Sequence, residues 1–574
     1  MKQQGMPLRK NFGSTIPVLI AVLTSLGWLL PSRFYPWTGF HQDAWIAIAS
    51  AVGGLLIMMS SNKPWRVPGL ALLVLAAACI PVFQWMGGQI SYIGTAGMTS
   101  AYLLGFALVI LMGARSEELR PNLLLDALFL SIGIAAVITV WLQLYQWLGM
   151  ISPDDWWAAG RDVARPSGNF SQPNHAATFL GWGICAAAWG CFRGRVGWAC
   201  ATLLAAYLLF GIALTGSRTA IVGGVVVIAL VFWWRKFWPS RHLFLVVCGL
   251  AFYYLAIVTI IGQPHEGDVL DNRLLGSSSI NERKLIWQIA MSALGEHPWL
   301  GYGWDQNFTA QLTIAYKNLA LHNSLSYFHN LFLDILVWNG IPLGGLLCGF
   351  ILYWFFHLVL NIKNSGQAIL MVFFILVANH SLVEFPLYYA HFLLPTGWII
   401  GALYSKVSFE VQPAIHLQSK TIAAMCAVAM VLLVVICVDY AKIEESSRKM
   451  RSEIAAGRNV ETMVPDIWLL NQLSSQLELT KLPELTYGLT DRQLNMVENV
   501  ARLPPSSSLQ LKAAKLLAIN HRPEQARWIL KRYCSVVPEG GCKYAQQSWR
   551  KLGIKHPEIA AITWPVKFEN VQGP

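Results

Sequence analysis

Long apolar runs recur along most of the chain and alternate with short polar segments. One helical crossing of a bilayer takes about 17 to 25 apolar residues, and on this measure the pattern predicts about thirteen membrane spans. They lie at 16–31, 44–60, 67–83, 99–113, 122–148, 174–192, 196–212, 217–234, 242–262, 330–360, 367–383, 388–405 and 421–438. The predicted fold class is therefore all-α, a polytopic membrane helical bundle.

The pattern changes after residue 438. No later apolar run is long enough to span a bilayer, but segments such as "SLQLKAAKLLAIN" and "PEQARWILKRYC" place apolar residues at helical spacing with Arg and Lys between them. We therefore predict a transmembrane domain at 1–438, with long loops at about 149–173 and 263–329. Residues 439–574 are predicted to form a small helical domain.

Composition agrees with this picture and narrows the class of partner. Of 574 residues, 55% are hydrophobic and only 13% are charged, which is too apolar for a soluble chain of this length. The formal net charge of +12 also suits a nucleic-acid partner. However, Lys and Arg occur in short clusters between apolar runs, as they do in cytoplasmic membrane loops. The pattern favours membrane lipids and predicts no nucleic-acid partner.

The basic residues predict the orientation of the chain. The first apolar run ends without a small-residue cleavage site, so we expect it to be a span rather than a signal peptide. Basic residues precede this span and then occupy every second loop, which places the N-terminus in the cytoplasm. The two long loops and the C-terminal domain are then exported. The basic residues are Lys2, Arg9, Lys10, Lys63, Arg66, Arg115, Arg120, Arg193, Arg195, Arg235, Lys236, Arg241, Lys363, Lys406 and Lys420.

Cysteine usage fits an exported C-terminal domain. Eight of the ten cysteines fall in predicted spans, whereas Cys534 and Cys542 lie in the last domain, separated by a "SVVPEGG" turn. A disulfide between them suits an oxidising compartment. The alternative, two free thiols, stays open because spacing alone does not establish geometry.

Polar residues gather where the 149–173 loop enters a span, in "ARPSGNFSQPNHAATF". Asn169, Gln172, Asn174 and His175 offer amides and an imidazole at a helix entry, which suits recognition of hydroxyl or phosphate groups. The alternative is that Asn174 or Ser171 simply caps the helix.

Two arginines lie where predicted helices meet an exported segment. Arg218, in "LTGSRTA", begins a span, and a guanidinium there can bind phosphate in bidentate fashion beside a helix N-terminus. Arg283 lies four residues before Trp287 on an amphipathic helix of the 263–329 loop. That helix is expected at the membrane surface, with Arg283 directed at a polar lipid-linked group. The alternatives are a snorkelling arginine and an interfacial helix without a ligand.

Histidines mark the remaining two groups. His322-Asn323 and His329-Asn330 repeat at a spacing of seven, so both imidazoles share one face if the following helix extends backward. An imidazole there can act as a general base, or it can cap the helix.

The last group is "NHSLVEFPLYYAHFLLPTG", in which Pro386 and Pro395 are expected to break the spans. His380, Glu384 and His391 are expected near the exported surface. No metal-ligand spacing is present, and we predict neither metal nor cofactor.

At this point the sequence resembles a family. "TGSRTA", "ERKLIWQIAMSALGEHPWLGYGW" and "HNLFLDILVWNGIPLG" resemble three blocks of the bacterial O-antigen ligase and polymerase superfamily. With "SGNFSQPNHAATF", "NHSLVEFPLYYAHFLLPTG" and the C-terminal helical domain, they resemble more narrowly the protein O-oligosaccharyltransferases, which glycosylate pilins and other periplasmic proteins.

The resemblance implies a multi-pass protein of the bacterial inner membrane whose 1–438 domain is catalytic on the periplasmic side. It implies transfer of a glycan from undecaprenyl diphosphate to a Ser or Thr hydroxyl of a protein acceptor. His329 would be the essential histidine, and Arg218 and Arg283 would bind the diphosphate. We expect inversion at the anomeric carbon without a metal. Candidates for substrate binding are Gln172, Asn174, His175, His322, Asn330, His380 and Glu384.

Two other functions stay open. An O-antigen ligase or a polymerase would use lipid A-core or a second glycan as the acceptor. A transporter of lipid-linked oligosaccharide belongs to a different class, and the gathering of polar residues on one side rather than at the middle of the membrane disfavours it.

Overall fold

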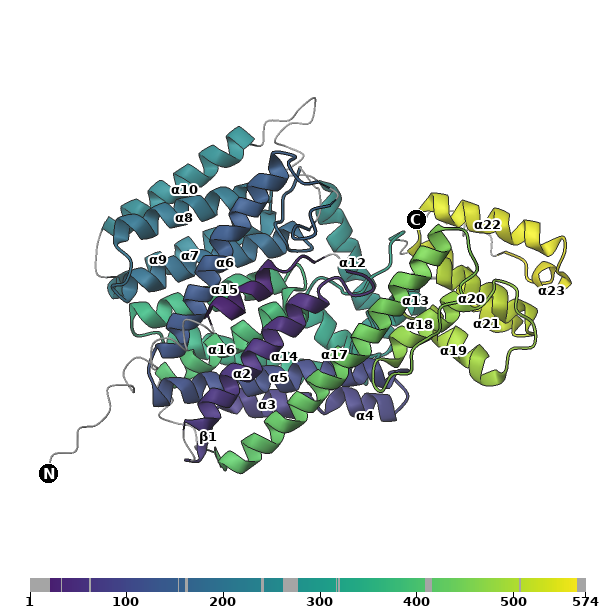
Figure 1. The fold of residues 1–574 in the computed structure, drawn as a ribbon, viewed down its shortest axis with the longest axis horizontal. Coiled ribbons are helices and arrows are strands. Elements are labelled where there is room, and N and C mark those ends of the chain that lie inside the picture. The colour runs from purple at the N-terminus through teal and green to yellow at the C-terminus, as the bar shows by residue number, and fades with distance from the viewer. Residues whose placement is uncertain are drawn as a thin grey trace. The chain divides into compact units, whose positions relative to one another are not determined.

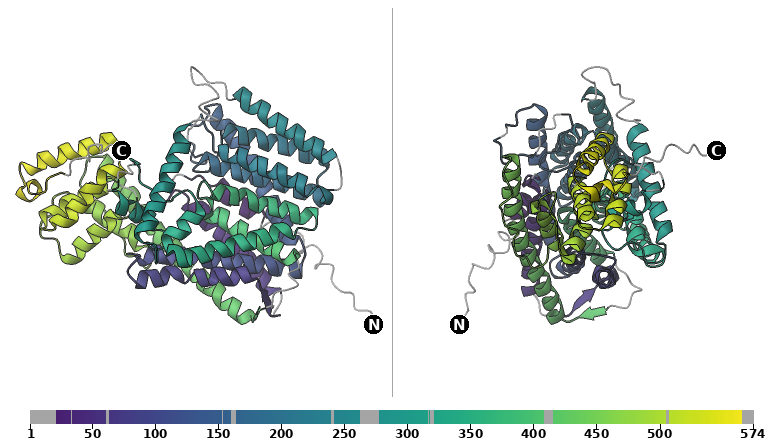
Figure 2. Two further views of the ribbon diagram at one scale, coloured as in Figure 1. Left: turned by 180° about the vertical axis from the view of Figure 1, so that it is seen from behind. Right: turned by 90° about the vertical axis from the view of Figure 1, so that its right-hand side faces the viewer.

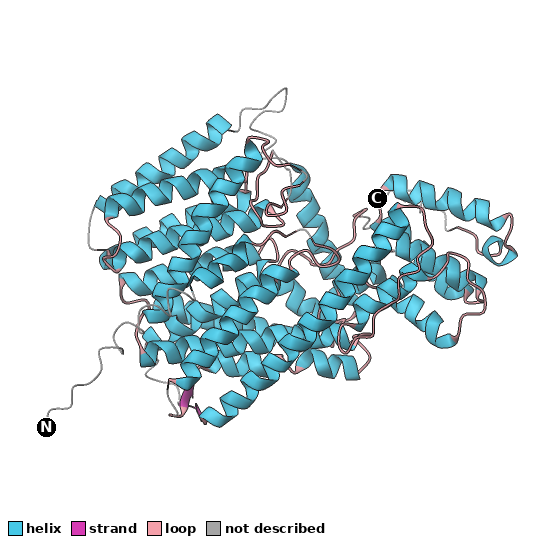
Figure 3. Ribbon diagram, in the orientation of Figure 1, coloured by secondary structure: helices cyan, strands magenta, loops and turns pink. Residues whose placement is uncertain are grey.

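The computed structural model describes residues 21–32, 34–60, 63–152, 154–159, 164–238, 242–261, 277–315, 317, 321–407, 415–504 and 507–564. Residues 16–20 of the first predicted span and residues 263–276 of the second long loop lie outside this part. The described chain is helical almost throughout (Figure 3). Its one sheet pairs β1 (Trp65–Val67) antiparallel with β2 (Ile415–Leu417). The predicted all-α class is confirmed.

Helices follow the apolar runs closely. Residues 21–29 are helical, and the elements that follow up to the last apolar run are α2 (Phe40–Met59), α3 (Gly69–Ala77), α4 (Ile80–Met86), α5 (Ile93–Leu119), α6 (Leu123–Trp147), α7 (Pro173–Phe192), α8 (Trp198–Leu214), α9 (Arg218–Trp233), η1 (Arg235–Phe237), α10 (His242–Ile261), α12 (Ser277–Glu296), α13 (Asn307–Ile314), α14 (Leu331–Leu360), α15 (Ser365–Ser381), η2 (Pro386–Tyr388), α16 (Ala390–Lys406) and α17 (Ser419–Ala455). The C-terminal elements are α18 (Asn471–Lys481), α19 (Asp491–Ala501), α20 (Ser507–Ile519), α21 (Pro523–Val536), α22 (Glu539–Gly553) and α23 (Pro557–Ala560).

Among the described residues, 7 helical stretches are long and apolar enough to cross a membrane, and three shorter helices are apolar as well. The chain is thus a helical membrane protein, whereas the count of about thirteen spans is not confirmed. Two boundaries differ from the prediction. The 67–83 run folds as α3 followed by α4, and the 421–438 run is the start of a helix of 37 residues, α17.

The chain forms two compact units. Unit 1 comprises Met1–Ala77, Ala101–Ser277 and Leu352–Leu433, and unit 2 comprises Ala78–Ser100, Ser278–Ile351 and Val434–Pro574. The division into a transmembrane domain, 1–438, and an exported domain, 439–574, stays a prediction.

Helix α7 lies at the centre of unit 1 and packs against α6, α8 and α15 (Figures 1 and 2). Small residues permit this close approach. A side chain at Gly183 would meet the methyl group of Ala136 on α6. On another face of α7, the fully buried Trp182 stacks on Phe373 of α15, with ring centroids 4.1 Å apart. Small residues and aromatic contacts are the means by which helices associate where lipid removes the hydrophobic effect.

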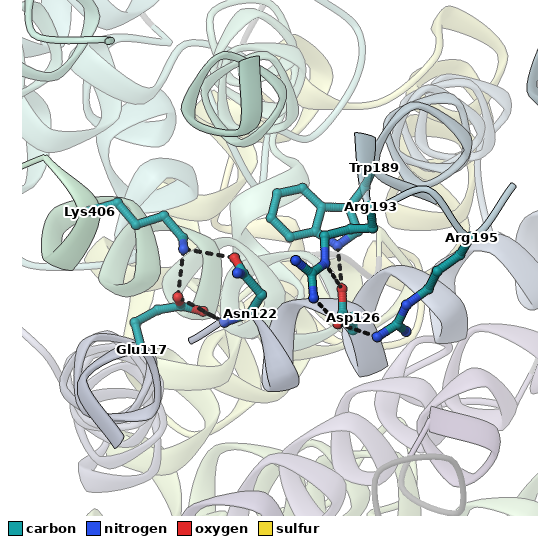
Figure 4. Close-up of polar contacts among 7 residues, drawn as sticks. All are labelled: Glu117, Asn122, Asp126, Trp189, Arg193, Arg195 and Lys406. Atoms are coloured by element: carbon teal, nitrogen blue, oxygen red, sulfur yellow. Dashed lines mark hydrogen bonds and ion pairs between the residues drawn. The ribbon is translucent and has the colours of Figure 1, made fainter. Parts of the chain in front are cut away.

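Ion pairs hold one end of unit 1 together. The carboxylate of Asp126 accepts hydrogen bonds from Arg193 at 3.1 Å and Arg195 at 2.6 Å (Figure 4). Beside them, Lys406 pairs with Glu117 at 2.6 Å. Glu117, Lys406 and the two arginines come from three of the predicted basic loops, and Asp126 lies in the first turn of α6. The structure thus gathers these loops at one end, as their alternation along the chain requires. That this end is cytoplasmic stays a prediction.

Unit 2 is built around a break in α14. Gly340 has φ 71° and ψ 175°, so the helix is interrupted there. The interruption releases backbone carbonyls, and a turn at 298–304 satisfies them. Tyr302 N–H donates to the carbonyl of Val337 at 2.9 Å, and Gly303 N–H donates to that of Trp338 at 3.0 Å. Non-helical backbone at membrane depth is tolerated only where such partners exist.

The last six helices pack in sequence around an apolar core to which Phe308 and Leu312 of α13 also belong, and the expected helical bundle is confirmed. Thr490 and Gln493 form a capping box at the start of α19. Cys534 and Cys542 are joined by a disulfide, with Cα atoms 5.0 Å apart, where α21 turns into α22.

We predict that Gly340→Ala destabilises the protein by about 1–3 kcal/mol, because alanine is strained at positive φ. The new methyl group would also meet the carbonyl of Trp299. The measurement is the thermal unfolding midpoint of the purified protein in detergent. Gly345→Ala is the control, since nothing lies within 4 Å of its added methyl group. Equal midpoints for both variants would contradict the strain argument.

Candidate functional site

Within unit 1, the structure brings together two of the polar groups that the sequence singled out. The side-chain amides of Gln172 and Asn174 both point to Glu384, each 3.4 Å from a carboxylate oxygen. Helix α7 begins at Pro173 with Gln172 as its N-cap residue, and no side chain makes a cap hydrogen bond there. The capping alternative for Asn174 is therefore not what the structure shows.

His175 and His380 lie side by side, with ring centroids 5.3 Å apart. Both are buried, and Nδ1 of His380 lies 2.8 Å from the hydroxyl of Thr178. Neither ring nitrogen of His175 has a hydrogen-bond partner in the structure, and the aromatic ring of Tyr389 packs against its imidazole.

His380, Glu384 and His391 are all at least nine-tenths buried in the protein. That they lie near the exported surface of the membrane stays a prediction. The expectation that both prolines break the spans is wrong for one of them. Pro386 begins the short η2 helix between α15 and α16, but Pro395 lies inside α16 and does not break it.

The partner of His391 is a residue that the sequence reasoning missed. Oδ1 of Asp43, at the start of α2, lies 2.7 Å from Nδ1 of His391, and its Oδ2 accepts a hydrogen bond from Tyr102 at 3.0 Å. A buried carboxylate needs such partners. The sequence feature that could have identified Asp43 is the presence of an acidic residue at the edge of an apolar run.

Arg218 is the first residue of α9 and is half-buried. The hydroxyl of Ser217 caps the helix by accepting the N–H of Ala220 at 3.3 Å, and Asn379 on α15 donates to the carbonyl of Thr219 at 3.3 Å. The cap and this cross-helix bond fix the end of α9 from which the guanidinium projects. A positive side chain and the free N–H groups of a helix N-terminus both suit an anion.

In unit 2, Arg283 and Trp287 lie on α12, one turn apart, as predicted. Arg283 is half-buried. The apolar face of α12, through Ile286, Ile289 and Ala293, packs in one core cluster with α13 and α14.

The two predicted histidines both have left-handed backbones, with φ 55° at His322 and 53° at His329. Helix α14 begins only at Leu331, so it does not extend backward and the two imidazoles do not share a helix face. The helix entry is capped by Asn330, whose Oδ1 accepts the N–H groups of Phe332 and Leu333. The alternative role of His329 was to cap the helix, and the neighbouring Asn330 performs it instead.

His322 is bound to the C-terminal helices. Its Nδ1 lies 3.2 Å from the carbonyl of Cys534 and 3.3 Å from that of Val537, and its backbone N–H donates to Ser535 at 3.1 Å. These carbonyls lie at the C-terminal end of α21, beside the disulfide between Cys534 and Cys542. This geometry indicates a structural role for His322, which differs from the role predicted for His329.

A buried network that the sequence reasoning left without a role lies beside His329. Oδ1 of Asp334, which is 1% exposed, accepts the N–H of Phe328 at 2.9 Å and the amide of Asn307 at 2.6 Å. Asn307 in turn accepts the indole N–H of Trp338 at 2.7 Å. No pattern in the sequence indicated that α13 supplies Asn307 as a partner of Asp334.

Among the described residues, no cluster of three or more His, Cys, Asp and Glu side chains is placed to hold a metal ion. Among the predicted site residues, the side chains with a permanent positive charge are those of Arg218 and Arg283.

Comparison with known families gives three matches along the chain. A model described as O-antigen ligase matches residues 203–348, a region that contains Arg218, Arg283 and His329. A model described as protein glycosylation ligase matches residues 166–189, and one described as virulence factor membrane-bound polymerase, C-terminal, matches residues 368–551.

Two curated proteins of Acinetobacter baylyi are similar over much of their length. The chain is 30% identical to a general O-oligosaccharyltransferase over 525 residues, covering 89% of this chain and 90% of that protein. It is 26% identical to a ComP-specific O-oligosaccharyltransferase over 363 residues, covering 61% of this chain and 65% of that protein. The chain therefore belongs to the bacterial O-oligosaccharyltransferases of the O-antigen ligase superfamily.

Proposed function

We propose that this glycosyltransferase moves an oligosaccharide from undecaprenyl diphosphate to a Ser or Thr hydroxyl of a periplasmic or pilin-like protein. The observation that carries the proposal is the setting of His329. This half-buried imidazole has a left-handed backbone just before the first turn of α14, inside the region that matches O-antigen ligases. The names of the two relatives support a protein acceptor.

In the proposed reaction, His329 takes the proton of the acceptor hydroxyl as that oxygen attacks the anomeric carbon. The bond between the anomeric carbon and the diphosphate oxygen breaks, and undecaprenyl diphosphate leaves with the electron pair. One displacement inverts the configuration and forms no covalent enzyme intermediate. An alkyl hydroxyl is a weak nucleophile, so removal of its proton in the transition state contributes typically about 10²–10⁴-fold.

The proposed role of Arg218 and Arg283 is to bind the diphosphate and stabilise the charge that develops as it leaves. A guanidinium stays charged at every physiological pH and forms paired hydrogen bonds with phosphate oxygens. Two arginines supply the positive charge that a divalent cation provides in many phosphoryl enzymes, so we propose transfer without a metal. Transfer that continues in EDTA would support this part of the proposal.

The match to families described as O-antigen ligase and as membrane-bound polymerase favours a second candidate function, in which lipid A-core or a glycan is the acceptor. A transporter of lipid-linked oligosaccharide is a third. Co-expression with a lipid-linked glycan pathway and candidate periplasmic proteins, followed by intact mass measurement, separates them. A glycan-sized mass increment on one protein supports our proposal, and elongated or lipid A-linked glycan without it supports the second function.

We predict that His329→Ala lowers transfer by about 10²–10⁴-fold, as expected for the loss of general-base assistance. His322→Ala should keep substantial activity, because His322 bonds to backbone carbonyls of the C-terminal helices. The measurement is glycosylated acceptor at matched membrane levels of each variant. Near-normal transfer by His329→Ala together with loss in His322→Ala would move the catalytic assignment by seven residues.

Arg218→Lys and Arg283→Lys are each predicted to lower transfer about tenfold or more, since lysine keeps the charge but loses one charge-assisted hydrogen bond to the diphosphate. Arg235→Lys is the matched control, because this exposed arginine follows the opposite end of α9. Wild-type rates for both site variants would assign these arginines to membrane anchoring.

A reporter that is active only in the periplasm should be active when fused after residue 574, because the predicted topology exports the C-terminal domain. The same reporter fused after Val407, in a predicted cytoplasmic loop, should be inactive. The reverse pattern would invalidate the proposed side of the reaction.

A further inference from the structure

Within unit 2, the residues of the short helix α13 face three different groups of neighbours. Phe308 and Leu312, one turn apart, belong to the apolar core of the C-terminal helices. Ala310 and Ile314 belong to the cluster that contains the apolar face of α12. These contacts bury α13 from two sides, and they leave its polar residues to face the segment that carries His329.

Asn307 and Gln311, also one turn apart, form the polar stripe of α13. Both are almost completely buried, at 0% and 2% exposure. Gln311 donates to the carbonyl of Asn323 at 2.8 Å and accepts the N–H of Leu325 at 2.8 Å. It thus binds an acceptor and a donor of the loop backbone on the N-terminal side of His329.

Asn307 acts on the other side of the loop. Its amide donates to Asp334, whose same oxygen accepts the N–H of Phe328, the residue next to His329. The loop from 323 to 330 is therefore held at Asn323, Leu325 and Phe328. A backbone held at these points keeps the left-handed conformation at His329, which costs free energy in isolation.

The C-terminal helices hold α13 in turn. Arg532 on α21 donates through Nε to the carbonyl of Leu312 at 2.8 Å, and the hydroxyl of Ser535 donates to that of Ala315 at 3.2 Å. Leu312 lies in the last turn of α13 and Ala315 is its C-cap residue, so both bonds attach the C-terminal end of α13 to α21.

We propose that α13 is a positioning element for His329, in which Asn307 and Gln311 fix the 323–330 loop and the C-terminal helices fix α13. This inference rests on the proposed function, because it assigns Asn307, Gln311 and Asp334 to the placement of the base. It also gives the C-terminal helices a task in the reaction at a distance from the substrate. A catalytic group displaced by about 1 Å can lose about 10²-fold in rate.

The first test is independent of activity and uses Gln311→Met in the full-length protein in lipid nanodiscs. Methionine keeps the volume of glutamine but makes neither hydrogen bond. Amide hydrogen exchange at Leu325 and Phe328 should accelerate, while exchange within α14 after Gly340 stays unchanged. The control is Thr313→Ala on the same helix, because that hydroxyl bonds only to the carbonyl of Thr309 within α13. Unchanged exchange in Gln311→Met would overturn the proposal.

The second test measures transfer from an undecaprenyl-diphosphate-linked oligosaccharide to the acceptor identified by mass. Gln311→Met should lower kcat by about 10²-fold with little change in KM for the donor. Asp334→Asn should keep most of the activity, because an amide oxygen can still accept from Asn307 and Phe328. In a His329→Ala background, Gln311→Met should cause no further loss, since a positioning residue has no effect once the base is absent.

An equal loss in both backgrounds would overturn the proposal, because Gln311 would then act independently of His329. Wild-type kcat in Gln311→Met would overturn it as well. Wild-type transfer by His329→Ala would instead refute the proposed role of His329, and the exchange result would still report whether α13 holds the loop. The two failures are thus distinguishable.

Arg532→Ala tests the contribution of the C-terminal helices, because it removes the hydrogen bond from α21 to the carbonyl of Leu312 on α13. It should accelerate exchange at Leu325 and lower kcat, whereas Arg527→Ala on the same helix should do neither, because Arg527 pairs only with the neighbouring Glu524. Equal behaviour of the two arginine variants would remove the C-terminal helices from the proposal.

Discussion

The requirement that every backbone polar group in apolar surroundings have a partner governs unit 2. Helix α14 can break at Gly340 because the 298–304 turn donates N–H groups to the carbonyls of Val337 and Trp338. The turn needs room for this approach, and Gly301 supplies it, since a side chain there would meet the carbonyl of Val337. The sequence blocks "HPWLGYGW" and "WNGIPLG" are therefore two halves of one hydrogen-bonded junction.

Several buried carboxyl groups have such partners as well. In unit 1, Asp43 is matched by His391 and Tyr102, and Asp126 is matched by two arginines. In unit 2, Asp334 accepts hydrogen bonds from the side-chain amide of Asn307 and from the backbone N–H of Phe328. Both donors are neutral, so these contacts position the segment that carries His329 by hydrogen bonding.

Local patterns in the sequence predicted most of the helices, since most apolar runs fold as one helix. They also placed Arg218 and His329 beside helix starts and Arg283 on an amphipathic helix. They did not predict the partnership of Asp43 with His391, because 348 positions separate these residues and neither has a periodic signature. The positioning role of Asn307 and Gln311 was not predicted, for a related reason. A polar pair one turn apart normally indicates an exposed helix face, and only the packing of α13 between two apolar clusters buries it.

The attachment of His322 to the turn at Cys534 also orders events during synthesis. About 200 residues separate His329 from Cys542, so at about 5–20 residues per second the ribosome needs roughly 10 to 40 seconds to add the segment that completes the loop's surroundings. Throughout that interval the apolar helices of the nascent chain are already available for insertion. The loop that carries His329 thus reaches its final geometry only after the segment through Cys542 has been synthesised.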